Sequence, residues 1–244
     1  MRLEISTLSI LPEVRPGDDL AALTQEAASR EGQAIDHSLI VVVAQKVVSK
    51  AESAIVDLRG IRPSVLAQSW ASKWGKDPRL IELVLSQSRR IVKMDRGVLI
   101  TETRHGFICA NAGVDQSNTE VDDFATILPD DPDASAQRLR VALGCGAVII
   151  TDTFGRPWRE GLVDVALGVA GLDPLKDYRG SVDRRGRKLA GTIIAVADQL
   201  AAAAGLLMGK SSGCPVVLIR GFEWQAAEGI AQALIRRPDQ DLFR

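Results

Sequence analysis

Two uninterrupted apolar runs constrain the fold of this chain more than any other feature. Residues 38–44 read Ser-Leu-Ile-Val-Val-Val-Ala, and residues 147–151 read Ala-Val-Ile-Ile-Thr. Continuous stretches of β-branched residues are typical of buried strands, whereas strands with one wet face alternate between polar and apolar residues. We therefore expect both runs to form buried strands.

The rest of the chain predicts an irregular mixture of helices and strands. Because strands and helices do not alternate in a βαβ rhythm, we expect the α+β class, with mixed sheets and flanking helices. No linker rich in glycine, serine or proline is present, so residues 1–244 are predicted to form one domain, whose subdomains, if any, are discontinuous. Further strands are expected at 3–10, 91–110 and 215–220, and helices at 20–30, 63–74, 78–88, 131–143, 191–208 and 226–236.

Charge and composition exclude several classes of partner. Thirty basic residues face 31 acidic ones, and aromatic residues make up 4% of the chain. This balance favours neither nucleic acid nor an anionic membrane, and it provides few rings for base stacking. No apolar run reaches the ~20 residues of a membrane span, and no signal peptide is evident. Three widely spaced cysteines suit reduced thiols, so we expect a cytoplasmic protein.

Several common catalytic motifs are absent or incomplete. Residues 205–211 resemble a P-loop, but the first glycine comes one place too late, and the segment follows a predicted helix and precedes a strand. The chain has two histidines, His37 and His105, which excludes a His-rich zinc site. The Gly-x-Ser-x-Gly pattern of a nucleophile elbow is also missing.

Two segments combine acidic side chains with neutral oxygen donors. Asn111-Ala-Gly-Val-Asp115-Gln-Ser-Asn118 places a carboxylate and an amide three residues apart after a glycine, and Asp152 and Thr153 follow the second apolar run. Such oxygen donors suit Mg²⁺, and two separated carboxylates could share a phosphate site with one or two metal ions. The alternatives are an Asx turn in the first segment and capping or turn formation in the second.

Two basic segments could bind phosphate or another polyanion. Residues 45–52, directly after the first apolar run, contain Lys50, a point charge suited to phosphate. Residues 183–188 place Arg184, Arg185, Arg187 and Lys188 around a glycine. A solvated turn and a solvated hairpin are the respective alternatives.

Taken together and in this order, the motifs resemble those of the coenzyme F-420-0:L-glutamate ligase family, over nearly the whole chain. The family occurs alone or fused to a nitroreductase-like domain, and this chain is similar to the stand-alone form. The residues that carry the resemblance are 11–19, 42–52, 111–118, 151–159, 183–192 and 215–221.

The resemblance implies an activity and a set of partners. Members of the family join L-glutamate to the lactyl carboxylate of the deazaflavin F-420-0 and then add a second, γ-linked glutamate to F-420-1. They use GTP, require Mg²⁺ or Mn²⁺, are assisted by a monovalent cation such as K⁺, and form homodimers of two-subdomain chains. We therefore expect a GTP-dependent ligase. The alternatives, based on the same Asp115 and Asp152, are a metal-dependent phosphohydrolase or kinase and a non-catalytic nucleotide-binding module.

The resemblance also implies roles for individual residues. Asp115 and Asp152 correspond to one metal site and Thr153 to a second, and Lys50, Asp115 and Asp152 are the expected catalytic residues. Arg184, Arg185, Arg187 and Lys188 could bind the phosphodiester or the carboxylates of the substrate. Acidic residues of other members are replaced here by 209–213, where Lys210 could contact a phosphate. The expected GTP contacts are Leu11, Pro12, Glu13, Val14, Gln45, Lys50 and Asn118.

Overall fold

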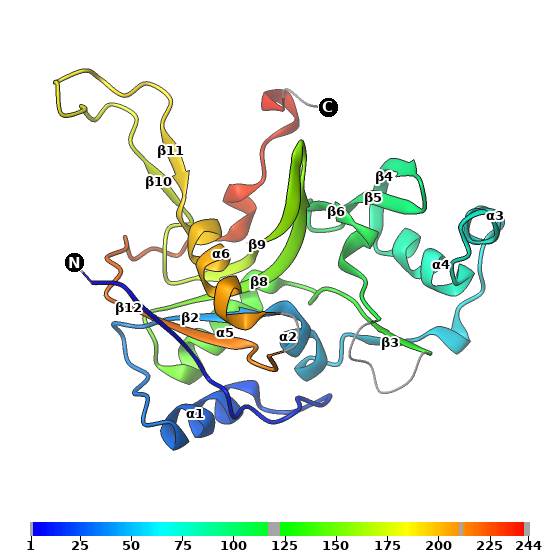
Figure 1. Ribbon diagram of the computed structural model, residues 1–244, viewed down its shortest axis with the longest axis horizontal. Helices are drawn as coiled ribbons and strands as arrows, with labels where there is room; N and C mark the ends of the chain where they lie inside the picture. The colour runs from blue at the N-terminus through cyan, green and yellow to red at the C-terminus, as the bar shows by residue number, and fades with distance from the viewer. Residues whose placement is uncertain (1, 117–122, 210–211, 242–244) are drawn as a thin grey trace.

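A mixed five-stranded sheet forms the centre of the computed structural model, which describes residues 2–116, 123–209 and 212–241. Its strand order is β1-β12-β2-β8-β9 (Figure 1). Only β2 and β8 run parallel; the other neighbours in this sheet are antiparallel. The bounds are β1 Glu4–Thr7, β12 Val216–Arg220, β2 Ile40–Ala44, β8 Ala147–Arg156 and β9 Arg159–Ala170.

The two apolar runs form buried strands, as predicted, and they are the parallel pair of the sheet. Residues 40–43 and 147–150 are at most 1% exposed, and the pairing extends from Ile40 opposite Ala147 to Ala44 opposite Thr151. Helices cover both faces of these strands. Helices α1 (Leu20–Arg30) and α5 (Pro132–Leu143) pack on one face. Helix α6 (Val196–Met208) packs on the other.

A separate apolar cluster lies among residues 56–127. Helices α3 (Val65–Trp74) and α4 (Pro78–Ser86) pack beside a three-stranded sheet in the order β4-β5-β6, at the right of Figure 1. Its strands are Ser88–Asp95, Val98–Thr103 and Ile108–Ala110. A two-stranded ladder of β3 (Ile55–Asp57) and β7 (Phe124–Thr126) connects this part to the central sheet. The chain is therefore α+β, with mixed sheets and flanking helices.

Some local predictions are wrong, and the structure gives the reasons. Strand β8 continues past Thr151 because β9, which was not predicted, pairs with it as far as Arg156. The expected helix 191–208 begins only at Val196, since residues 193–195 form β11 and pair with β10 (Leu175–Asp177).

The predicted helix at 226–236 is replaced by irregular chain with one 3₁₀ turn, Ala231–Leu234. Tertiary contacts override the helical pattern here. Gly229 approaches the backbone so closely that a Cβ would lie 2.2 Å from the Leu172 carbonyl oxygen. The Ala231 N–H donates to Asp133 Oδ1 at 2.8 Å instead of to a helical carbonyl.

Residues 45–51 form a helix, α2 (Gln45–Ala51), where the sequence predicted no regular element. Its Val48 is buried against the central sheet, which explains how a stretch with two adjacent valines is held in helical form. Among the described residues, none of the helices combines the length and apolar character that a membrane crossing requires.

Candidate active site

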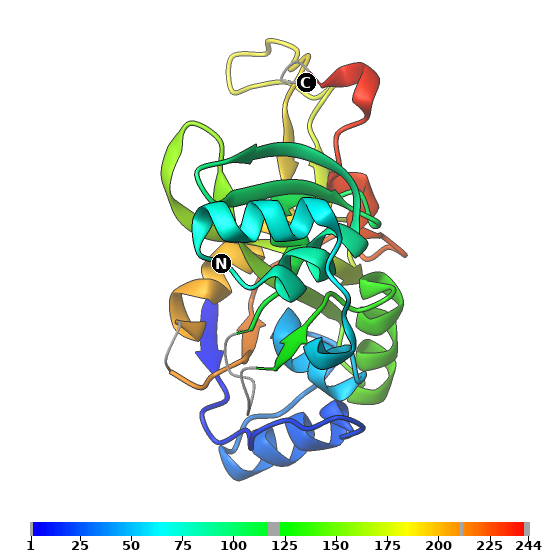
Figure 2. The same cartoon turned by 90° about the vertical axis from the view of Figure 1, so that its right-hand side faces the viewer.

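Helix α2 begins at the carboxyl end of β2, beside the point where β8 extends beyond it. Ala44 ends β2 and pairs with Thr151, so Gln45 and Asp152 are the next residues along the two parallel strands. Crevices at the carboxyl ends of parallel strands are common ligand sites. Figure 2 shows the β3–β7 ladder close to α2 at this edge.

Two buried polar side chains fasten α2 to the neighbouring segment. Gln45 Nε2 donates to the Ile127 carbonyl oxygen at 3.2 Å and to Ser49 Oγ at 2.5 Å. Ser49 Oγ donates to the same carbonyl at 2.6 Å. Since Gln45 is 3% exposed and its amide nitrogen donates to two protein acceptors, it positions α2 in the described structure.

Lys46 and Asp115 form the first ion pair of the site. Lys46 Nζ lies 2.7 Å from Asp115 Oδ2. The backbone of Asp115 is fixed by Thr126, which accepts from its N–H at 3.0 Å and donates to its carbonyl at 2.8 Å. The carboxylate predicted from the Asn111–Asn118 segment is therefore held against the first turn of α2.

Lys50 lies on the same face of α2, one turn after Lys46, and forms the second ion pair. Its Nζ contacts Glu13 Oε1 at 2.5 Å, with the lysine side chain 10% exposed and the glutamate 69% exposed. Leu11 and Val14 pack on the central core, which places residues 11–14 beside this helix. The structure thus brings together the described residues that were predicted to contact a nucleotide.

Cys109 shows that Asp152 and the segment 111–115 face the same region. This buried cysteine on β6 has its pKa raised to about 12, first by burial and then by the negative charge of Asp152. A backbone hydrogen bond with Gly113 acts in the opposite direction. One thiol therefore interacts with Asp152 on β8 and with the loop that carries Asp115.

Thr153 is engaged by a carboxylate that sequence analysis missed. Its hydroxyl donates a short hydrogen bond to Asp164 on the neighbouring strand, and the two residues are paired in register. Asp164 in turn packs against Gly205 of α6, where a Cβ would lie 2.3 Å from Asp164 Oδ2. The strand β9 was not predicted, so this residue could not be placed next to Thr153.

The donors at this edge are hard oxygens. Asp115 and Asp152 contribute carboxylates, and Thr153 contributes a hydroxyl. Mg²⁺ is commonly held by one or two carboxylates together with substrate phosphates, so Asp115 and Asp152 fit such an ion. Thr153 follows Asp152 directly on β8 and therefore points to the opposite face, toward Asp164. Within the described residues, no three histidine, cysteine or acidic side chains cluster closely enough to hold a metal ion by themselves.

The four basic residues at 184–188 lie elsewhere. They belong to the connection between β10 and β11, which projects from the body at the upper left of Figure 1. The turn is internally bonded, since Asp183 Oδ1 accepts the N–H groups of Arg185 and Arg187 at 2.8 and 2.9 Å. Within the described structure the arm is separate from α2. The predicted contacts Asn118 and Lys210 lie outside the described residues.

Comparison with known protein families identifies the family to which this chain belongs. Residues 10–221 match the model of the F420-0:gamma-glutamyl ligase family. The chain belongs to this family. The matched range includes α2, both aspartates, Thr153 and the projecting arm, as the resemblance of the motifs predicted.

Curated relatives of this ligase family match along almost their full length. A coenzyme F420:L-glutamate ligase from Methanothermobacter thermautotrophicus is 47% identical over 242 residues, covering 96% of each chain. The relative of the same name from Methanopyrus kandleri is 45% identical and covers 99% of this chain and 98% of its own. That from Methanocaldococcus jannaschii is 42% identical over 86% of each chain.

Proposed function

We propose that the protein is a GTP-dependent ligase that joins L-glutamate to the lactyl carboxylate of coenzyme F-420-0. The observation that carries the proposal concerns α2, which begins at the carboxyl end of the parallel strands. Two lysines on one face of this helix form ion pairs with carboxylates. Lys46 contacts Asp115, Lys50 contacts Glu13, and Asp152 follows directly on β8. The names of the relatives support the acceptor and the amino acid.

The chemistry needs an activated carboxylate, because oxide is a very poor leaving group. A carboxylate oxygen of F-420-0 attacks the γ-phosphorus of GTP, the bond to the β-phosphate oxygen breaks, and an acyl phosphate and GDP form. The neutral amine of glutamate then attacks the acyl carbon. The carbon–nitrogen bond forms, inorganic phosphate leaves and the nitrogen loses its proton.

This sequence of steps requires positioning and charge neutralisation rather than a nucleophilic side chain. Lys50 would release Glu13 and bind a phosphate oxygen of GTP instead. Lys46 would lie beside Lys50 on the same helix face. Residues 11–14, Gln45 and Asn118 would shape the nucleotide site. Asp115 and Asp152 would hold one Mg²⁺ or Mn²⁺ ion and Thr153 would contribute to a second, with K⁺ as an assisting ion. A bound divalent ion neutralises phosphate charge during the transfer.

The proposal extends to a second, γ-linked glutamate added to F-420-1 and to a cytoplasmic homodimer. The projecting arm supports the homodimer in one respect. Its basic residues Arg184, Arg185, Arg187 and Lys188 leave the body of their own subunit, so they would bind the substrate's phosphodiester or carboxylates across the dimer.

Mass spectrometry tests the proposed function directly. Purified protein is incubated with GTP, Mg²⁺, L-glutamate and F-420-0, and each component is omitted in turn. We expect one or two glutamyl additions that depend on GTP and metal, with GDP released only when the acceptor is present. GTP hydrolysis without an acceptor would instead indicate a phosphohydrolase, and binding without turnover would indicate a nucleotide-binding module.

A further inference from the structure

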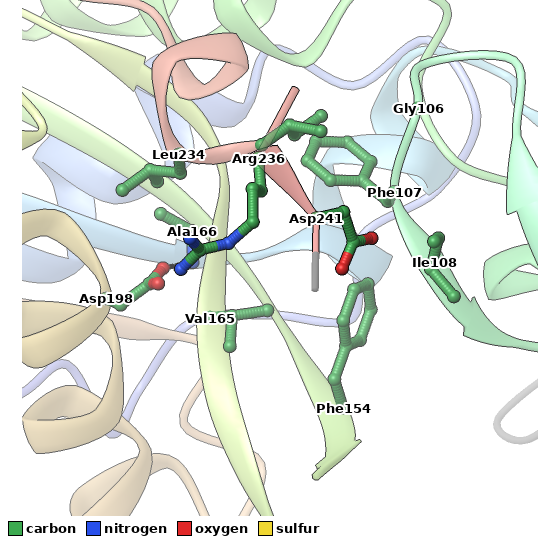
Figure 3. Close-up of a pocket in the computed structure, with 11 residues that line it drawn as sticks. Gly106, Phe107, Ile108, Phe154, Val165, Ala166, Asp198, Leu234, Arg236 and Asp241 are labelled. Atoms are coloured by element: carbon green, nitrogen blue, oxygen red, sulfur yellow. Dashed lines mark hydrogen bonds between the residues drawn. The ribbon is translucent and has the colours of Figure 1, made fainter. Parts of the chain in front are cut away.

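A cavity lies beside the proposed active site and is not used by the mechanism above. It has a volume of about 240 Å³ (Figure 3). Phe107 and Ile108 line it from the start of β6, and Phe154 and Val165 from the β8–β9 hairpin. Leu234 and Arg236 of the C-terminal segment also line it.

Strand geometry connects this cavity to Asp152. Side chains two residues apart on a strand point to the same face, as do residues directly opposite each other in an antiparallel pair. Phe154 is two residues after Asp152, and Val165 is the register partner of Asp152. The cavity wall and the proposed metal ligand therefore share one face of the hairpin.

The cavity wall is mainly apolar and partly aromatic. Phe107 and Phe154 form an edge-on ring pair with centroids 6.5 Å apart and an interplanar angle of 73°. Aromatic side chains in this arrangement provide a surface on which a flat ring can stack. The volume is below the ~300 Å³ at which sites for whole drug-sized ligands begin, so the cavity suits a ring system rather than an entire cofactor.

The polar part of the cavity lining carries charges of both signs. One guanidinium, Arg236, faces two carboxylates, Asp198 and Asp241, so the charged groups of the cavity sum to −1. Asp198 accepts from the Ala166 N–H at 2.9 Å, and Figure 3 shows Arg236 reaching into the cavity from the C-terminal segment. L-glutamate, with two carboxylates and one ammonium, would leave the aromatic wall without a partner. A flat ring with N–H and C=O groups on its edge could stack on the wall and pair with both kinds of charged side chain.

We propose that this cavity binds the heteroaromatic ring of the acceptor, the deazaflavin portion of F-420-0, and so orients its carboxylate-bearing tail toward Asp152. The assignment rests on the proposed function. Phe154 stacks on one face of the ring and Phe107, whose plane is turned by 73°, contacts its edge, while Arg236 donates to a ring carbonyl and Asp198 accepts from a ring N–H. L-glutamate then enters from elsewhere.

The test uses a fragment that contains the ring without the reacting group. The probe is the 8-hydroxy-5-deazaflavin ring with its ribityl chain and no phosphate or lactyl group, and its binding to the full chain is measured by equilibrium dialysis. We expect Phe154→Leu and Arg236→Gln each to weaken binding about tenfold, the loss of one stacking or charged contact. Phe222→Leu, a matched phenylalanine change outside the cavity, leaves binding unchanged, as does Asp152→Asn.

Steady-state kinetics provide the second readout. Phe154→Leu should raise KM for F-420-0 about tenfold, by the same loss of stacking, and leave KM for GTP and for glutamate unchanged. Failure of the wild-type chain to bind the fragment overturns the assignment, as does equal binding by the cavity variants or a selective rise of KM for glutamate. Wild-type glutamyl transfer by mass spectrometry is measured in parallel. If wild type transfers glutamate and the cavity variants bind the fragment as wild type does, the ring site alone is refuted. If wild type does not transfer glutamate, the proposed function is refuted.

Discussion

The ammonium group of Lys46 lies 2.7 Å from a carboxylate oxygen of Asp115, so a cation of the protein already neutralises a proposed metal ligand. The pair joins the first turn of α2 to the segment after β6, two regions 69 positions apart in sequence. A divalent ion that binds Asp115 must compete with this lysine.

Replacing Lys46 should therefore strengthen metal binding when no nucleotide is present. The pair is partly exposed, and such pairs contribute up to ~1 kcal/mol, so we expect Lys46→Met to tighten Mn²⁺ binding severalfold in calorimetric titrations. Asp115→Asn should weaken it. Lys73→Met, an exposed lysine on α3, serves as the matched control. An unchanged Mn²⁺ affinity in Lys46→Met would show that this carboxylate does not bind the metal.

Variants of the ion pair between Lys50 and Glu13 can distinguish a role of Lys50 in nucleotide binding from a role in stabilising the fold. Lys50→Met removes the proposed phosphate contact, and we expect GTP-dependent glutamyl transfer to fall by a factor of ~10² or more, as for loss of a charge-stabilising group. Glu13→Gln removes only the partner, which is 69% exposed, and should preserve most of the activity.

Thermal unfolding of both variants distinguishes the interpretations. Because one partner of the pair is well exposed, Glu13→Gln should cost less than ~1 kcal/mol of unfolding free energy. If Glu13→Gln abolishes transfer as completely as Lys50→Met, the ion pair itself is required and the proposed exchange of Glu13 for phosphate is wrong.

The central sheet was predictable because its signal is local. The runs at 38–44 and 147–151 are apolar without interruption, and such runs have few alternatives to buried strands. The helix at Gln45–Ala51 was not predictable in the same way, because Val47 and Val48 continue the β-branched pattern, and the core contact of Val48 decides the conformation.

The site shows the same division between local and non-local information. The polar segments around Asp115 and Asp152 were visible as motifs in the sequence. Lys46 was missed as the partner of Asp115. Its position on the same helix face as Lys50 follows only once residues 45–51 are known to form a helix. Asp164 was missed because its contact with Thr153 depends on the register of an unpredicted strand.

Gly205 on α6 offers a way to move Thr153 without touching it. A Cβ at this position would lie 2.3 Å from Asp164 Oδ2, and Asp164 accepts the hydrogen bond of the Thr153 hydroxyl. Gly205→Ala should therefore displace Asp164 and lower glutamyl transfer about tenfold, in the range seen for disturbed positioning of metal ligands. Stability should change little, since alanine gains up to ~1 kcal/mol of helix propensity against the steric cost.

The comparison variant is Leu206→Ala, which changes an 84% exposed side chain on the same helix. Its transfer rate should equal that of wild type. A large fall in melting temperature in Gly205→Ala, with transfer per folded molecule unchanged, would show that Asp164 serves packing and does not position Thr153.

The three cysteines should differ sharply in reactivity, because the thiolate rather than the thiol is the nucleophile. Burial raises the pKa of Cys109 to about 12 and that of Cys145 to about 11. Both pKa values lie above pH 8, so both groups stay protonated there, with a thiolate fraction for Cys109 of ~10⁻⁴. Cys214 is half-buried and therefore the accessible thiol.

Iodoacetamide at pH 8 should add one carbamidomethyl group to the native chain, located at Cys214 by peptide mapping, and three after denaturation. Cys214→Ser should remain unlabelled when native. Modification of native Cys109 at a rate similar to that of Cys214 would mean that the β6 edge opens to solvent and that Cys109 does not stay buried.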